Sequence, residues 1–123
     1  MQYNQSINEV VREAHETAID KGFYEDIYTA YNVLDKLGMQ AVQRIVKRDF
    51  VLAQLAKIGS EVGETVQAIQ HHDIYSEHVA EELADIMIRV CDLAGYLEIN
   101  MGRAVHMKMT HNKLRPRKHG KIC

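Results

Sequence analysis

The chain has 123 residues, a length typical of one domain. Hydrophobic residues make up 46% and charged residues 26%, as in ordinary soluble globular proteins, and the formal net charge of −2 gives no overall attraction to nucleic acid. A single proline favours long helices over a turn-rich sheet fold, and two cysteines are too few for a disulfide framework.

The apolar residues follow a helical spacing, and no alternating strand pattern is present. Ser6-Ile-Asn-Glu9 has the form of a capping box, which predicts a first helix that runs to about Lys21 and stops at Gly22. A second helix is expected over residues 25–37, with Gly38 after its end.

From residue 39 to about 72 the spacing remains helical. Asp49 is a candidate N-cap just before Phe50, so we expect a short helix over 39–47 followed by a long one. The long helix carries a predicted apolar stripe, whose members are Val51, Leu55, Ile58, Val62, Val66 and Ile69.

Residues 71–76 break the helical pattern and predict a loop. Ser76 is expected to cap a helix over 77–97, and Asn100 to cap a last helix that ends near residue 112. The prediction is therefore an all-α bundle of four to five helices.

One helical domain is expected over residues 1–112, followed by a basic tail over 113–123. The first residues show no basic segment followed by an apolar stretch, and no apolar run approaches the length that spans a bilayer. We therefore expect a soluble cytoplasmic protein without a membrane partner.

Two acidic pairs, Glu61-Val-Gly-Glu64 and Glu82-Leu-Ala-Asp85, are the most informative feature. Each pair has i, i+3 spacing, so its carboxylates project from one side of a helix, at the border of the apolar stripe. Four carboxylates facing one another across two packed helices would repel unless cations lay between them. Oxygen ligands of this kind suit Mg²⁺ or Mn²⁺ rather than zinc, and a magnesium site usually serves a phosphate-bearing substrate.

Two other interpretations of the acidic pairs remain open. Acidic pairs at this spacing are common on solvated helix faces, and Glu13-Ala-His-Glu16 is a third example in the same chain. A di-iron carboxylate bundle needs Glu-x-x-His on its helices, and no glutamate here has a histidine three residues later.

The wider constellation of motifs resembles the MazG-like family of all-α nucleoside triphosphate pyrophosphohydrolases. It comprises Lys57-Ile-Gly-Ser-Glu61-Val-Gly-Glu64, a gap of 17 residues, Glu82-Leu-Ala-Asp85-Ile-Met-Ile, and Lys108-Met-Thr-His-Asn112-Lys-Leu-Arg115-Pro116. The resemblance runs from about residue 50 to 116. A weaker one covers residues 7–26, where His15 and Lys21-Gly-Phe-Tyr24 resemble the first helix of the dCTPase-like branch.

The resemblance implies Mg²⁺-dependent cleavage of a nucleoside triphosphate to the monophosphate and pyrophosphate, with Mn²⁺ as a substitute, in cleansing or adjusting the nucleotide pool. It implies a homodimer or homotetramer that completes the helical core. The implied metal ligands are Glu61, Glu64, Glu82 and Asp85. Glu64 is favoured for activating the water, although Glu61 would serve as well on spacing grounds.

The resemblance also implies contacts to the substrate. Lys108, Asn112 and Arg115 would bind the phosphates. His15 would stack on the base, and Tyr24 would line its pocket, where that branch usually has tryptophan. Arg89 stands where the branch often has a tyrosine near the sugar, and this departure leaves the base and sugar preference open.

Residues 27–48 form an insertion relative to compact members of that branch. Two other classes of function stay open. The first is a nucleotide-binding regulatory module of the same fold without turnover. The second is a nucleic-acid-binding helical protein that uses the basic segment Lys113–Lys121, which the acidic balance elsewhere disfavours.

Overall fold

The computed structural model describes residues 2–71 and 73–120, and every regular element in these two ranges is helical. The elements are α1 (Gln2–Asp20), α2 (Glu25–Lys36), α3 (Gln40–His71), α4 (Glu77–Tyr96), α5 (Met101–Leu114) and a short 3-10 helix, η1 (Arg117–Gly120). The described residues therefore confirm the all-α prediction. None of these helices is long and apolar enough to cross a membrane.

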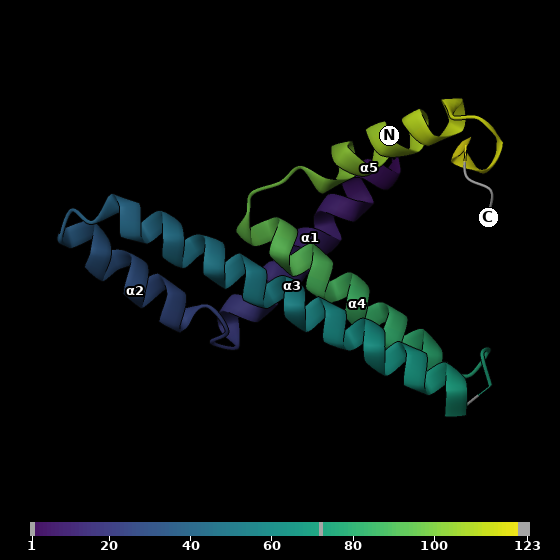
Figure 1. Cartoon of the computed structure of the whole chain (residues 1–123), viewed down its shortest axis with the longest axis horizontal. Coiled ribbons are helices and arrows are strands. Elements are labelled where there is room, and N and C mark those ends of the chain that lie inside the picture. The colour runs from purple at the N-terminus through teal and green to yellow at the C-terminus, as the bar shows by residue number, and fades with distance from the viewer. Residues whose placement is uncertain (1, 72, 121–123) are drawn as a thin grey trace.

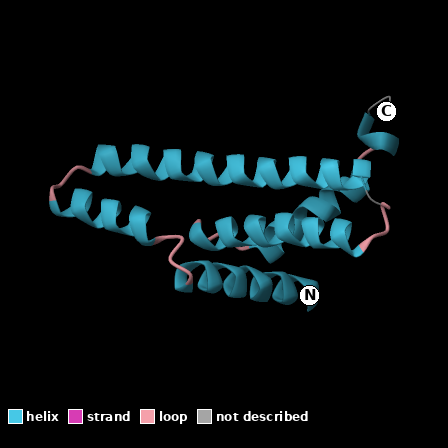
Figure 2. Cartoon of the chain, turned by 90° about the horizontal axis from the view of Figure 1, so that it is seen from below, coloured by secondary structure: helices cyan, strands magenta, loops and turns pink. Residues whose placement is uncertain are grey.

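The long helix α3 lies along one side of the molecule (Figure 1). Helix α2 packs on the first part of α3 and α4 packs on the second part, so that α2 and α4 follow one another beneath it (Figure 2). Helix α1 packs on α4, and α5 packs on α1. Residues 27–48, the expected insertion, form most of α2, the turn after it and the start of α3.

The caps predicted for the last two helices are confirmed. The Ser76 hydroxyl accepts a hydrogen bond from the Val79 amide at 3.4 Å at the start of α4. The Asn100 side chain accepts one from the Arg103 amide at 3.1 Å at the start of α5. These side chains satisfy amides that the first helical turn leaves without a partner.

The predicted start of the first helix is wrong. Helix α1 begins at Gln2, so the expected capping box over residues 6–9 lies inside the helix. Polar residues that favour caps remain compatible with a helix interior, and packing of α1 on α4 and α5 stabilises the helical form.

The predicted break near Asp49 is also wrong, because α3 is continuous and the expected short helix over 39–47 is its first part. The Asp49 carboxylate pairs with the Arg48 guanidinium at 3.1 Å instead of capping a backbone amide. Phe50 packs on Tyr96 of α4, with ring centroids 5.1 Å apart, which favours an uninterrupted helix at this point.

An aromatic cluster holds the turn between α1 and α2 against the two helices that follow. Tyr24 is its centre, with 2% of its surface exposed. Its ring stacks on Tyr96 at 5.2 Å and lies 5.6 Å from Phe50. A smaller apolar core joins α1 to α4 through Val11, Cys91 and Ala94.

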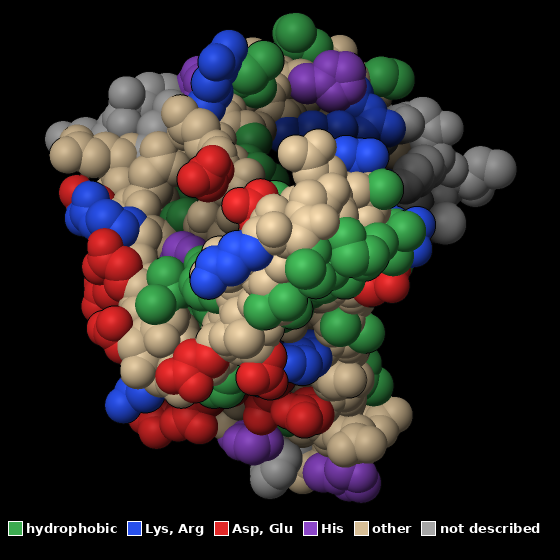
Figure 3. Space-filling view, turned by 90° about the vertical axis from the view of Figure 1, so that its left-hand side faces the viewer, with side chains coloured by type: hydrophobic (Ala, Val, Ile, Leu, Met, Phe, Trp, Pro, Cys, Tyr) green, Lys and Arg blue, Asp and Glu red, His purple; other side chains and the backbone are tan. Residues whose placement is uncertain are grey.

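The apolar stripe predicted on α3 is only partly covered by the other helices. Large side chains on α3 are between 45% and 56% exposed, namely Ile45, Leu52, Leu55, Val62, Val66 and Ile69. On α4, Leu83, Met87 and Ile88 are exposed to a similar degree. Figure 3, which faces the α2–α3 turn, shows further hydrophobic side chains at the surface beside acidic ones.

Candidate active site

Three of the four expected acidic residues meet where α3 packs on α4. Glu61, Glu64 and Glu82 each offer a carboxylate oxygen, and these oxygens lie within 4.8 Å of one another. The i, i+3 spacing brings the two α3 carboxylates to one side of the helix, and helix packing supplies the third. We call these three residues the acid cluster.

The acid cluster has unsatisfied hydrogen-bonding capacity. The Oε2 atom of Glu82 is buried and has no hydrogen-bond partner among the described residues. Its other oxygen lies 3.8 Å from His78 Nε2. A buried carboxylate oxygen without a donor or cation is costly, so the position is suited to a cation.

Mutual repulsion raises the pKa of the Glu64 carboxyl. The largest cause is the negative charge of Glu61, followed by a hydrogen bond with Glu61 and by desolvation, and the charge of Glu82 adds to them. Arg89 opposes the shift. Carboxylates placed so close together favour either a proton or a bound cation.

The fourth expected ligand, Asp85, lies beside the acid cluster but outside it. Its side chain lines the adjoining pocket from α4, as does Arg89 one helical turn further on. The Arg89 Nε atom donates a hydrogen bond to Glu61 Oε1 at 2.8 Å. This contact joins α4 to α3 at the edge of the acid cluster.

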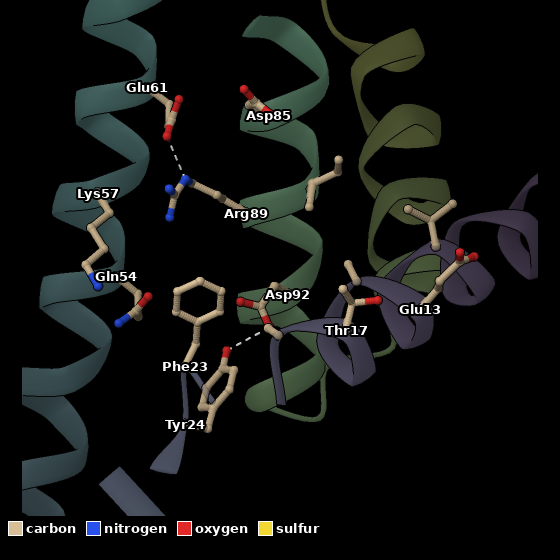
Figure 4. A pocket seen from close by; sticks show the side chains of 14 residues that line it. Glu13, Thr17, Phe23, Tyr24, Gln54, Lys57, Glu61, Asp85, Arg89 and Asp92 are labelled. Atoms are coloured by element: carbon tan, nitrogen blue, oxygen red, sulfur yellow. Dashed lines mark hydrogen bonds and ion pairs between the residues drawn. The ribbon is translucent and has the colours of Figure 1, made fainter. Parts of the chain in front are cut away.

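A pocket of about 580 Å³ opens next to the acid cluster, between α1, α3, α4 and the α1–α2 turn. Its walls are Val10, Glu13, Ala14, Thr17, Ala18, Phe23, Tyr24, Gln54, Lys57, Glu61, Asp85, Ile88, Arg89 and Asp92. Figure 4 shows Glu61 and Asp85 at one end, Phe23, Tyr24 and Asp92 at the other, and Lys57 and Arg89 between them. A cavity of this size accommodates a small organic ligand.

Asp92 is held in place at the end of the pocket away from the acid cluster. Its Oδ1 atom accepts a hydrogen bond from the Tyr24 hydroxyl at 2.8 Å and lies 2.9 Å from His15 Nδ1. Burial raises the pKa of Tyr24 above its ordinary value, and the hydrogen bond to Asp92 adds to the shift. Tyr24 therefore remains a protonated donor.

The residues expected at the base and sugar, His15, Tyr24 and Arg89, differ in their positions. Arg89 lies against Glu61, away from the Phe23 end of the pocket. Tyr24 lines the pocket, although its hydroxyl is engaged by Asp92. His15 is not among the residues that line the pocket; it lies behind Asp92, with 16% of its side chain exposed. Its ring meets the Tyr24 ring edge to face, at 4.8 Å between centroids.

The expected phosphate-binding residues are not assembled with the acid cluster within one chain. Lys108 and Asn112 belong to α5, which packs on α1, and Arg115 follows that helix. None of the three lines the pocket. The Asn112 Oδ1 atom is buried without a partner among the described side chains.

Sequence reasoning missed Asp92 and Phe23. One signal was available for Asp92, because Asp85, Arg89 and Asp92 are spaced i, i+4 and i+7 and so share one side of α4. Phe23 precedes Tyr24 in the α1–α2 turn, and only the position of the turn shows which of the two rings is exposed.

Comparison with protein families identifies one matching family. The sequence model of the MazG nucleotide pyrophosphohydrolase domain matches residues 51–120, which is more than half of the chain. No curated protein and no solved structure matches the chain. The matched segment contains both acidic pairs and most of the α3–α4 packing. By its sequence, its all-α fold and its acidic pairs, the chain belongs to the MazG family of nucleotide pyrophosphohydrolase domains.

Proposed function

We propose that this protein is a Mg²⁺-dependent nucleoside triphosphate pyrophosphohydrolase. It would cleave a ribonucleotide or deoxyribonucleotide at the α-phosphorus to the monophosphate and pyrophosphate, and so cleanse or adjust the nucleotide pool. The observation that carries the proposal is the joint position of the acid cluster and the pocket, since Glu61 belongs to both.

The residues of the acid cluster fit a hard divalent cation. They offer only oxygen ligands, and the buried Glu82 Oε2 atom lacks any other partner among the described residues. Glu61, Glu64 and Glu82 would hold Mg²⁺ or Mn²⁺, with Asp85 from the adjoining wall. The bound cation would neutralise phosphate charge and lower the pKa of a coordinated water.

Glu64 is the acid that we favour for orienting and deprotonating the attacking water. Glu61 already accepts a hydrogen bond from Arg89, whereas Glu64 is exposed. The pKa of Glu64 is raised by its acidic neighbours, and a raised pKa makes a carboxylate a better proton acceptor.

The charges along the pocket define the direction of the nucleotide. Arg89 lies against Glu61, and Lys57 lies between the acid cluster and Phe23 (Figure 4); both would contact the phosphates. Asp92 lies at the other end, beside Phe23, where its negative charge repels a polyphosphate. The triphosphate would therefore lie toward the acid cluster and the nucleoside toward Phe23.

We propose that the protein forms a homodimer or homotetramer through the half-exposed stripe of α3. Side chains such as Leu55 and Val66 would bury substantial apolar area against a second copy. Lys108, Asn112 and Arg115 would then contact phosphates in the pocket of the neighbouring copy, because within their own chain they lie outside the pocket.

The test is incubation of the purified protein with Mg²⁺ and a panel of canonical and modified NTPs and dNTPs, with chromatographic separation of the products. Monophosphate and pyrophosphate are expected from the wild type and not from Glu64→Gln. The matched control is Glu16→Gln, on the exposed side of α1, which should retain full activity. Release of phosphate with diphosphate would contradict attack at the α-phosphorus.

Two results would favour the other classes of function. Nucleotide binding without turnover across the panel would support a regulatory module. Salt-dependent DNA binding that disappears when residues 113–123 are removed would support a nucleic-acid-binding protein, and Glu64→Gln would leave that binding unchanged.

A further inference from the structure

We infer that Asp92 and Phe23 form a base subsite that selects nucleobases with an exocyclic amino group, such as cytosine and adenine, over those with a carbonyl group in its place, such as uracil and hypoxanthine. The inference rests on the proposed function for the identity of the ligand as a nucleotide. The preference itself follows from the chemistry of one end of the pocket.

Asp92 presents a fixed hydrogen-bond acceptor to the pocket. Both of its contacts, with Tyr24 and with His15, involve Oδ1. Oδ2 has no hydrogen-bond partner among the described residues, and the side chain lines the pocket with 21% of its surface exposed. Since two neighbours hold the other oxygen, Oδ2 is a preorganised acceptor.

Two aromatic contacts fix these neighbours in turn. Tyr24 stacks on Tyr96 with ring planes 23° apart, and its pKa is raised by burial, so its hydroxyl continues to donate. His15 contacts both residues, since its Nδ1 lies 2.9 Å from Asp92 Oδ1 and its ring lies 4.8 Å from the Tyr24 ring. His15 is thus a positioning residue, since it acts through Asp92 and does not line the pocket.

Phe23 supplies a flat apolar surface beside this acceptor. It follows Gly22, whose φ of 85° allows the tight turn after α1. The ring is 72% exposed, yet it lines the pocket and lies next to Asp92 (Figure 4). An exposed aromatic ring inside a pocket is suited to stacking on a nucleobase, whichever base it is.

The edge of the base then decides the preference. An amino group donates an N–H to the free Asp92 oxygen. A carbonyl oxygen in the same place offers no proton and faces a carboxylate, so its lone pairs and the negative charge repel. Glu13 and Thr17 line the α1 side of the pocket and carry no positive charge, and Lys57 lies across the pocket on α3, where we assign it to the phosphates.

The experiment compares matched substrate pairs that differ in this one group. We would measure kcat/KM for dCTP against dUTP and for dATP against dITP, together with the Kd values of the corresponding α,β-methylene analogues, which cannot be cleaved. The wild type should prefer the amino member by about tenfold to hundredfold, as expected for a hydrogen bond to a charged group.

Asp92→Asn should remove this preference or reverse it, because the amide can turn its NH₂ toward a carbonyl. Phe23→Ala should weaken the binding of both members of each pair alike. Asp20→Asn, on the exposed end of α1 and outside the pocket, is the matched control and should keep the wild-type preference. Thermal melting would identify a variant that fails to fold. If Asp92→Asn fails to fold, the base subsite is tested by Phe23→Ala and by the wild-type preference within each substrate pair.

The outcomes separate this inference from the proposed function. Equal kcat/KM within each pair in the wild type would overturn the base subsite and leave pyrophosphohydrolysis standing. Selective binding of the amino analogues without turnover would support the subsite and overturn the enzyme assignment. If the wild type shows no turnover and no selective binding, the base subsite and the proposed function are both overturned.

Discussion

Arg89 of α4 donates a hydrogen bond from Nε to Glu61 Oε1 of α3 at 2.8 Å. A cationic side chain thus lies against the group of carboxylates proposed to hold the metal. Arg89 also lines the pocket, so it can exchange its contact with Glu61 for a contact with a phosphate. Arg89 would therefore compete with the metal cation for Glu61 and would bind a phosphate of the substrate.

Arg89→Gln should raise the affinity of the protein for Mn²⁺ in the absence of nucleotide and raise KM for the triphosphate. The substitution removes positive charge from Glu61, so the acid cluster attracts a cation more strongly, while the phosphates lose a partner. Calorimetric titration with Mn²⁺ and steady-state kinetics measure the two effects. Arg48→Gln, whose guanidinium pairs with Asp49 at the surface, is the control. An unchanged Mn²⁺ affinity in Arg89→Gln would refute the competition.

Glu64→Gln should stabilise the metal-free protein at neutral pH. A carboxyl whose pKa is raised on folding contributes stability that is complete below its unfolded pKa and is lost as the pH rises through the folded pKa. The difference in Tm between the variant and the wild type should therefore grow with pH in melts from about pH 4 to pH 8. Added Mg²⁺ should reduce this difference, since a cation relieves the repulsion. A difference independent of pH would contradict the cause that we assign.

Tyr24→Phe should lower the free energy of unfolding by about 1–3 kcal/mol, because it removes a buried hydroxyl that donates to a carboxylate. Tyr28→Phe is the matched control, since Tyr28 lies in the same aromatic cluster but is 40% exposed, against 2% for Tyr24, and its loss should be much smaller. Urea denaturation at equilibrium measures both. Equal losses in the two variants would show that the contact with Asp92 contributes little.

Gly95→Ala and Gly59→Ala should have opposite effects on stability. A Cβ at Gly95 would lie 2.6 Å from the His15 Cβ, so α1 and α4 would have to move apart, at a cost of about 1–3 kcal/mol. A Cβ at Gly59 meets nothing within 4 Å in the middle of α3, and alanine there should stabilise by roughly 0.5–1 kcal/mol. Denaturant titrations of the two variants give the comparison. A stabilised Gly95→Ala would contradict the close approach of the two helices.

Mixing Lys108→Ala with Glu64→Gln should restore activity that neither variant has alone, if Lys108 contacts the phosphates in a neighbouring copy. A mixed dimer then contains one pocket with both an intact acid cluster and an intact lysine. Activity after co-refolding at different ratios is the measurement. The non-complementing control is a mixture of the single variants Glu61→Gln and Glu64→Gln, because neither supplies an intact acid cluster. No recovery, although size-exclusion chromatography shows mixed dimers, would contradict the exchange of residues between copies.

Local chemistry explains why much of this protein was predictable from its sequence. The caps at Ser76 and Asn100 and the turns at Gly22 and Gly38 depend on the residues next to them, so their signals are short-range. The break expected at Asp49 failed because Arg48 and Phe50 give its neighbourhood better contacts than a cap would. Propensity is a weak signal where packing decides.

The sequence by itself determined the helical class, the two acidic pairs and the family, because periodicity and i, i+3 spacing are fixed by the helix alone. Only the tertiary structure decided which acids meet, since the approach of Glu82 to Glu61 and Glu64 depends on how α4 packs on α3. The same holds for the base end of the pocket, where α1, the turn after it and α4 bring together residues far apart in the chain. The turn leaves Phe23 exposed and buries Tyr24 against Asp92, and no local pattern distinguishes these two neighbouring rings.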